Sequence, residues 1–133
     1  MLRDALDISL CIEVLCYRPA ILREKCNAEA DGLSISTIVL TELLHSAAKS
    51  QRPIETRREV ERFAALLEVL PFDAEAAAHA ADIRAVLEKK GQTIGGYDVL
   101  IAGHARSRGL IVVTGNLREF RRVEGLRCEN WLT

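Results

Sequence analysis

Short apolar segments alternate with longer helical stretches along this chain, and this alternation limits the fold more than any other feature. The clearest strand spans residues 110–113, four β-favouring apolar residues that directly follow a glycine. Weaker strand patterns occupy residues 2–6, 33–36, 68–70 and 126–130. Strands interleaved with helices form a parallel sheet that helices cover on both faces. We therefore predict an α/β fold, a parallel sheet within an α/β/α sandwich.

The helical stretches are marked by residues that begin or end helices. Residues 9–17 and 19–29 read as a helical pair that is interrupted at Pro19. Further helices are predicted at 37–49, 53–67, 73–90 and 97–108. The chain has no internal repeat, proline-rich linker or low-complexity tract. We expect a single domain over residues 1–133.

Composition excludes several classes of protein. Hydrophobic residues make up 49% of the 133 residues and charged residues 28%, which excludes a disordered chain. Eighteen Lys and Arg balance 19 Asp and Glu, so any nucleic-acid role needs local basic patches. There is no apolar run near the ~20 residues that span a bilayer, and no signal-peptide pattern. With four cysteines and no CxxC pair, we expect free thiols and a cytoplasmic protein.

Oxygen-bearing side chains recur near the expected ends of strands. Asp7 ends the first strand, and Asn116 follows the strand at 110–113. Glu42 lies in the helix after the second strand, and Asp98 opens a later helix. Ligands of parallel α/β folds bind outside the carboxyl ends of the strands. These four side chains are therefore our candidate site.

The helical acids point to metal chemistry because each lies on an apolar helix face. Glu42 shares its face with Ile38 and Val39, and Asp98 shares its face with Ile101. A carboxylate in such a place is costly unless it is paired or binds a metal. Oxygen ligands without histidine favour Mg²⁺ or Mn²⁺, and such an ion supports phosphoryl transfer.

Each candidate also has an ordinary structural explanation, and spacing alone leaves both open. Asp98 could simply stabilise its helix N-terminus, and Glu42 could be an ion-pair partner. Asn116 and Glu119 could form a variant capping box, while Asp7 could be a polar strand end.

Several longer segments carry a family pattern in a fixed order. They are ISTIVLTELLHSAAKS (35–50), LEVLPFD (67–73), IGGYDVLIAGHARSRGL (94–110), VVTGNLREF (112–120) and ENWL (129–132). In these segments, over nearly its whole length, the chain resembles the PIN-domain ribonucleases, specifically the VapC toxins of type II toxin–antitoxin pairs. The resemblance implies a PIN-like domain and an endoribonuclease that uses Mg²⁺ or Mn²⁺ to activate water for RNA hydrolysis.

The resemblance also implies roles for individual residues. Asp7, Glu42, Asp98 and Asn116 would form the catalytic metal site, with Ser9, Thr114 and Glu119 as outer members. Such relatives usually cut tRNA or other translation-related RNA. They are typically homodimers, inhibited by a VapB-like antitoxin through which the complex binds promoter DNA.

The first motif departs from the family, because Ile8 replaces a small hydroxyl residue and Asp4 interrupts a normally apolar strand. This departure supports an alternative function, an inactive PIN-fold module that acts by binding its antitoxin or RNA. A phosphorylated signalling domain fits poorly, because Thr114-Gly115-Asn116 carries no lysine.

Residues 103–133 have a local excess of positive charge. Six arginines stand against Glu119, Glu124 and Glu129 between residues 103 and 133. Arg118 is our candidate for an RNA phosphate contact, and a solvated surface is the alternative for each arginine. We expect His79, His104 and Trp131 to be structural, and Tyr97 to pack rather than stack on a base.

Overall fold

A five-stranded parallel sheet forms the centre of the protein in the computed structural model, which describes residues 1–17 and 20–132. The strands lie in the order β3-β2-β1-β4-β5, and every neighbouring pair is parallel. Their bounds are β1 (Asp4–Leu6), β2 (Leu33–Ser36), β3 (Glu68–Leu70), β4 (Ile111–Val113) and β5 (Cys128–Glu129). The predicted parallel α/β fold is confirmed, although the first and last strands are shorter than the sequence indicated.

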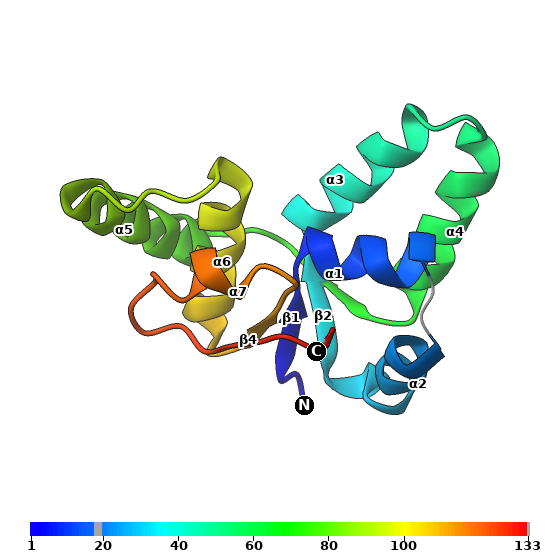
Figure 1. The fold of residues 1–133 in the computed structure, drawn as a ribbon, viewed down its shortest axis with the longest axis horizontal. Helices are drawn as coiled ribbons and strands as arrows, with labels where there is room; N and C mark the ends of the chain where they lie inside the picture. Colours follow the sequence, from blue (N-terminus) through cyan, green and yellow to red (C-terminus); the bar gives the residue numbers. More distant parts are fainter. Residues whose placement is uncertain (18–19, 133) are drawn as a thin grey trace.

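Helices cover both sides of this sheet (Figure 1). Helices α5, α6 and α7 lie on one side, and α1, α2 and α4 on the other. The helices are α1 (Ile8–Ile12), α2 (Ala20–Ala28), α3 (Thr37–Ala48), α4 (Pro53–Ala65), α5 (Ala74–Lys90), α6 (Gly96–Arg108) and α7 (Leu117–Phe120). A π-helical turn, Glu13–Tyr17, continues α1, and a 3-10 turn, Ala30–Gly32, precedes β2. The break predicted at Pro19 lies outside the described residues.

The helix ends follow the capping residues of the sequence. The Ser36 hydroxyl accepts a hydrogen bond from the N–H of Ile38 at 3.1 Å and begins α3. Asp73 begins α5 in the same way, through the N–H of Ala76 at 2.9 Å. Gly91 and Gly109 end α5 and α6 with φ of 66° and 67°, the left-handed conformation that glycine adopts freely. Within the described part of the chain, no helix has the length and apolar character needed to cross a membrane.

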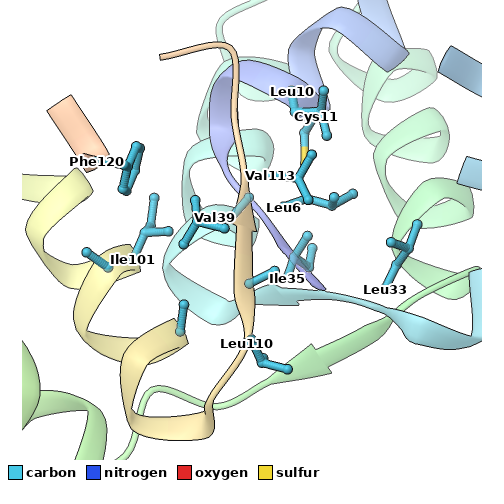
Figure 2. Packing of buried hydrophobic residues seen from close by; sticks show 14 of the residues in the cluster. Leu6, Leu10, Cys11, Leu33, Ile35, Val39, Ile101, Leu110, Val113 and Phe120 are labelled. Atoms are coloured by element: carbon cyan, nitrogen blue, oxygen red, sulfur yellow. The ribbon is translucent and has the colours of Figure 1, made fainter. Parts of the chain in front are cut away.

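The core lies between the sheet and the helices on each face (Figure 2). Val112 and Val113 of β4 are completely buried, which explains the unbroken apolar run of this strand. Phe120 is also completely buried, and in Figure 2 its ring lies next to Ile101 of α6. This buried ring anchors the short helix α7 in the core beside α6.

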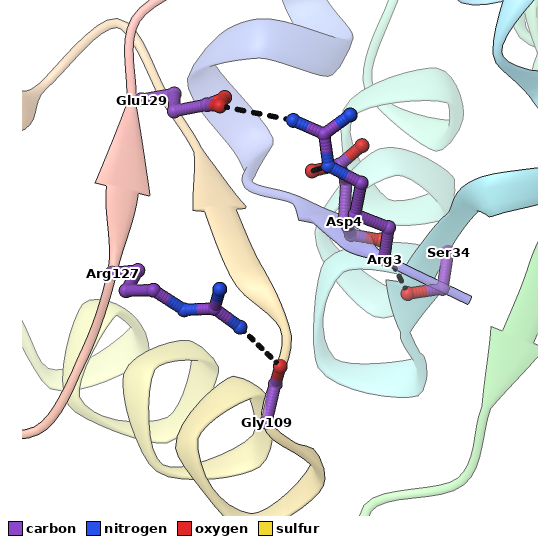
Figure 3. A network of polar contacts seen from close by, with 6 residues as sticks. All are labelled: Arg3, Asp4, Ser34, Gly109, Arg127 and Glu129. Atoms are coloured by element: carbon purple, nitrogen blue, oxygen red, sulfur yellow. Dashed lines mark hydrogen bonds and ion pairs between the residues drawn. The ribbon is translucent and has the colours of Figure 1, made fainter. Parts of the chain in front are cut away.

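Polar contacts link β1 to β2, the residue before β1 to β5, and the residue before β5 to Gly109 before β4 (Figure 3). Arg127 donates to the Gly109 carbonyl at 2.9 Å, and Arg3 lies 3.5 Å from Glu129 of β5. Asp4 is 1% exposed, and burial raises its pKa. Its carbonyl accepts a hydrogen bond from the Ser34 hydroxyl at 2.9 Å. The Asp4 carboxyl group lies 3.9 Å from the Arg3 guanidinium, and its Oδ1 makes no hydrogen bond among the described residues.

Helices α5 and α6 pack against each other without any space for a side chain at Gly103. A Cβ atom at this position would lie 2.5 Å from the backbone nitrogen of Ala80 and 2.7 Å from its Cβ. Only glycine allows the two helices to approach this closely.

The sheet order creates one point where neighbouring strands lead the chain in opposite directions. β1 has β2 on one side and β4 on the other, and the N–H of Asp7 donates to the Val113 carbonyl at 3.1 Å. Ligands of open α/β sheets bind at the carboxyl ends of strands at such a switch point. The residues that follow β1 and β4 are therefore where a ligand is expected to bind.

Candidate active site

Asp7 lies at this switch point, buried to 1% exposure, as the residue that caps α1. Its Oδ1 accepts from the N–H of Leu10 at 3.0 Å and from the Ser9 hydroxyl at 2.8 Å. Its Oδ2 accepts a short hydrogen bond from the Thr114 hydroxyl. Burial raises the pKa of Asp7, while the hydrogen bonds from Thr114, Leu10 and Ser9 lower it. Both oxygens are therefore held in a fixed direction.

Ser9 and Thr114 connect α1 to the loop after β4. The Ser9 hydroxyl accepts from the N–H of Gly115 at 3.0 Å, and the Thr114 hydroxyl accepts from the N–H of Asn116 at 2.8 Å. Thr114 is completely buried. The structure thus brings two of the three predicted outer members, Ser9 and Thr114, into direct contact with Asp7.

Asp98 and Glu119 form a second acidic pair, contributed by α6 and α7. The pKa of Asp98 is raised to about 7, first by burial, then by a hydrogen bond with Glu119, and then by the charges of Glu119 and Asp7. A carboxyl–carboxyl hydrogen bond requires a proton on one partner. The charges of Glu119 and Asp7 thus both repel an ionised Asp98, and we name these three residues the acidic site.

Asn116 follows β4 and stands at the start of α7, half-buried. Its side chain makes no capping hydrogen bond, so the structure lacks the capping box that was the alternative for Asn116 and Glu119. The carboxyl group of Glu119 turns to Asp98 instead.

Glu42 is half-buried on α3, and no hydrogen bond or ion pair links it to the acidic site among the described residues. The ion-pair explanation for Glu42 finds no partner in that part of the chain either. Across the described residues, no three His, Cys, Asp or Glu side chains converge closely enough to hold one ion. The structure thus joins Asp98 to Glu119 rather than to Glu42, which the sequence ranked higher.

The arginines of the C-terminal region divide into two kinds. Arg106 donates to His79 and Asp82, at 2.9 and 2.7 Å, and Arg122 donates to the Thr93 carbonyl at 2.9 Å. Arg118 is exposed on α7 beside Glu119, with no hydrogen bond or ion pair to the rest of the described chain. Arg118 is therefore available for an external partner.

Two aromatic residues differ in exposure. Trp131 is half-buried against the core, and the Lys25 ammonium lies 4.5 Å from its ring centre, so the predicted packing role is confirmed. Tyr97 is 52% exposed and lines a hollow of about 950 Å³ between α5 and the start of α6. The four cysteines are free, as expected.

The PIN domain family matches residues 5–126 of the chain. The chain belongs to the PIN-domain family. Within this family it groups with VapC: it is 47% identical to the tRNA(fMet)-specific endonuclease VapC of Shigella flexneri, over 98% of this chain and 99% of that protein. It is 42% identical to ribonuclease VapC2 of Haemophilus influenzae, over 99% of this chain and all of that protein.

Solved structures agree with this assignment to VapC. The DNA-bound VapBC of Salmonella typhimurium matches with a TM-score of 0.96 and 47% identity, over 98% of this chain and 99% of that chain. VapBC2 of Rickettsia felis, bound to a DNA fragment from its promoter, matches with a TM-score of 0.93 and 31% identity, over the same shares of the two chains. The resemblance expected from the sequence motifs is confirmed.

Proposed function

We propose that this VapC chain is a Mg²⁺- or Mn²⁺-dependent endoribonuclease, the toxin of a VapBC-type pair. The observation that carries the proposal is the crowding of Asp7, Asp98 and Glu119, which come from three separate elements. Crowded carboxylates raise one another's pKa unless a cation neutralises them. They lie where parallel α/β folds bind their ligands.

The donor set fits a hard divalent cation. Carboxylates of Asp7, Asp98 and Glu119 would hold it, with the Asn116 amide and the Glu42 carboxylate as further oxygen ligands. Mg²⁺ usually keeps several waters and needs only one or two protein carboxylates, so three converging acids are not required. When bound, the ion activates water and neutralises charge on the phosphodiester.

The chain's own residues would prepare this chemistry. Asp7 keeps its direction because Ser9, Thr114 and the N–H of Leu10 hold its two oxygens. Asp98, with a pKa of about 7, can hold or release a proton at neutral pH. Arg118 is exposed on α7, next to Glu119 in the sequence, and would contact a phosphate of the RNA.

The substrate and partners follow from the relatives. The Shigella flexneri and Salmonella typhimurium proteins are named as tRNA(fMet)-specific endonucleases, and we propose initiator tRNA as the first substrate to test. We propose a VapB-like antitoxin as partner, with promoter DNA bound through the complex. A homodimer is proposed on the resemblance to the VapC toxins alone.

Cleavage of a tRNA pool by the antitoxin-free protein tests the proposal. We expect discrete cuts with Mg²⁺ or Mn²⁺, no cuts with EDTA, and no cuts by Asp98→Asn. Asp31→Asn, an exposed acid in the 3-10 turn before β2, is the matched control and should cut like wild type. Cuts that persist in EDTA or in Asp98→Asn would overturn the proposal.

The alternative, a binding module without catalysis, rests on Ile8 in the first motif and on the missing contact between Glu42 and the acidic site in the described structure. It predicts a folded protein that binds RNA or its antitoxin but leaves initiator tRNA uncut at every metal concentration.

A further inference from the structure

A buried hydrogen bond joins the two helices that carry predicted site acids. His104 on α6 is 3% exposed, and its Nδ1 lies 2.8 Å from the Ser36 hydroxyl oxygen. Ser36 ends β2 and caps α3, which carries Glu42, while α6 carries Asp98. The bond therefore connects the N-terminus of α3, which carries Glu42, to α6, which carries Asp98.

This hydrogen bond does not satisfy all the polar groups of Ser36 and His104. The Ser36 oxygen already accepts the N–H of Ile38 at 3.1 Å. If the hydroxyl donates to Nδ1 of His104, the ring proton is on Nε2, which is buried without a hydrogen-bond partner in the described structure. If Nδ1 donates instead, the Ser36 hydroxyl needs another acceptor. The first arrangement leaves only the Nε2 proton for a further partner, whereas the second leaves both the Nε2 lone pair and the Ser36 hydroxyl proton.

A small cavity beside Ser36 and His104 has room for a water molecule that would be this further partner. Its volume is about 10 Å³, and His104, Ser34 and Ser36 are its polar lining. Space of this size holds about one water molecule when polar groups surround it. The Ser34 hydroxyl donates to the Asp4 carbonyl, as Figure 3 shows, and keeps its lone pairs free to accept from water.

The surroundings of His104 favour the neutral ring. Phe72 meets the imidazole edge-on, with ring centres 5.5 Å apart. Burial lowers the pKa of His104, the charge of Asp73 raises it, and the charge of Arg108 lowers it. An imidazolium here would place a charge and an unpaired donor inside the core. Phe72 also donates its N–H to Thr37 at 3.1 Å, so the first turn of α3 is fastened at a second point.

We propose that His104 is a positioning residue of the nuclease site: as a neutral imidazole, bonded to Ser36 and to one buried water, it fixes α3 against α6. This inference rests on the proposed function, because Glu42 and Asp98 are the acids that the two helices would present to the ion. His104 touches neither substrate nor ion.

Substitution tests the bond. His104→Leu removes both ring nitrogens, whereas His104→Asn keeps a polar atom near the place of Nδ1. We expect His104→Leu to weaken Mn²⁺ binding ~10- to 100-fold, as loss of a ligand-orienting contact commonly does. His104→Asn should recover most of the affinity. Ser36→Ala removes this bond together with the cap of α3, so it should weaken Mn²⁺ binding at least as much as His104→Leu, and the double variant should be no worse than Ser36→Ala. His45→Leu, an exposed histidine on α3, is the control.

Mn²⁺ affinity is measured by electron paramagnetic resonance without RNA, on variants shown to be folded by their melting curves. Wild-type affinity in His104→Leu, or additive losses in the double variant, would overturn the inference. Wild-type protein that binds Mn²⁺ and leaves RNA uncut would overturn the proposed function and leave the His104 comparison intact.

A second readout follows the ring itself. Long-range ¹H–¹⁵N spectra distinguish the two neutral tautomers of histidine from the charged ring, and His104→Asn assigns the signal. We expect one neutral tautomer of His104 from pH 5 to pH 8. A ring that titrates within this range, or that exchanges between tautomers, would overturn the inference.

Discussion

The carboxylate after β1 and the carboxylates on α6 and α7 belong to one acidic site, yet the protein holds them in opposite ways. Asp7 receives hydrogen bonds from two hydroxyls and a backbone N–H. Asp98 has Glu119 as its hydrogen-bond partner, and the charges of Glu119 and Asp7 both raise its pKa. One part of the site is therefore complete without a ligand, while the other part is under repulsion that a cation would relieve. The difference indicates where binding energy would be gained.

Asparagine substitutions test this contrast most strongly. Both Asp7→Asn and Asp98→Asn should lower cleavage at least ~100-fold, because losing a ligand exceeds the loss of an orienting contact. Their stabilities should differ in sign. Asp7→Asn should lower the melting temperature in EDTA, since it disturbs a cap and its donors, whereas Asp98→Asn should raise it at pH 8 by removing a repelled charge. If both variants changed the melting temperature by the same amount and in the same direction, Asp7 and Asp98 would not differ in the way described.

Thr114→Val tests the part of the acidic site around Asp7, where hydrogen bonds hold the carboxylate in place. The substitution keeps the shape of a completely buried side chain and removes its hydrogen bond to Asp7. Loss of a hydrogen bond to a charged group should cost about 1.5–3 kcal/mol in the free energy of unfolding. Thr41→Val, on the exposed face of α3, should change it by less than about 0.5 kcal/mol. Urea denaturation measures both, and an equal cost would count against a special role for Thr114.

The pH dependence of stability tests the part of the acidic site around Asp98, which the charges of Glu119 and Asp7 repel. The pKa of Asp98 is about 7 when folded and 3.8 in its reference state, so the folded protein binds this proton more tightly. The contribution of Asp98 is thus fully present below about pH 4 and lost as pH rises through 7. In EDTA, the melting temperature of wild type should fall relative to Asp98→Asn between pH 4 and pH 8. Parallel curves for the two proteins would contradict the raised pKa.

Divalent metal should reverse this trend, because the ion binds the deprotonated acids. The rise in melting temperature caused by Mn²⁺ should grow as pH increases through 7. Calorimetry at fixed Mn²⁺ concentration measures the rise at each pH. A rise that is the same at pH 5 and pH 8 would place the ion away from Asp98.

Arg118→Ala should have the smallest effect. We expect modestly weaker RNA binding and a slope of log affinity against log salt that is about one unit shallower, as for one lost phosphate contact. Arg127→Ala is not a clean control because Arg127 holds the Gly109 carbonyl, so Arg58, exposed on α4, serves as the comparison. An unchanged salt slope in Arg118→Ala would remove Arg118 from the RNA surface.

The sequence predicted the parts of the fold and site that depend on local chemistry. The apolar run of β4, the helices that begin near residues 37 and 73, and the place of Asp7 after β1 all follow from residue types at fixed offsets. The motif order also indicated Ser9 and Thr114 as neighbours of Asp7, and the structure joins all three.

The pairing of Asp98 with Glu119 could not be predicted, because it depends on where the buried Phe120 ring places α7. The apolar face of α3 indicated that Glu42 needs a partner, but helix periodicity does not say how far that face lies from another element. The unpaired Nε2 of His104 is likewise a property of tertiary packing. We expected His104 to be structural from the sequence, and the structure shows that its ring bonds to Ser36 at the start of α3.

The absent side chain at Gly103 has a consequence for how this protein can change over generations. Residue 103 lies five positions after Asp98, so about 7.5 Å of rigid helix separates the two. A methyl group at 103 would press on the Ala80 backbone and displace α6 as a unit. Any side chain at position 103 would therefore disturb the packing of α5 on α6 and the placement of Asp98 together, so one glycine constrains both the fold and the site.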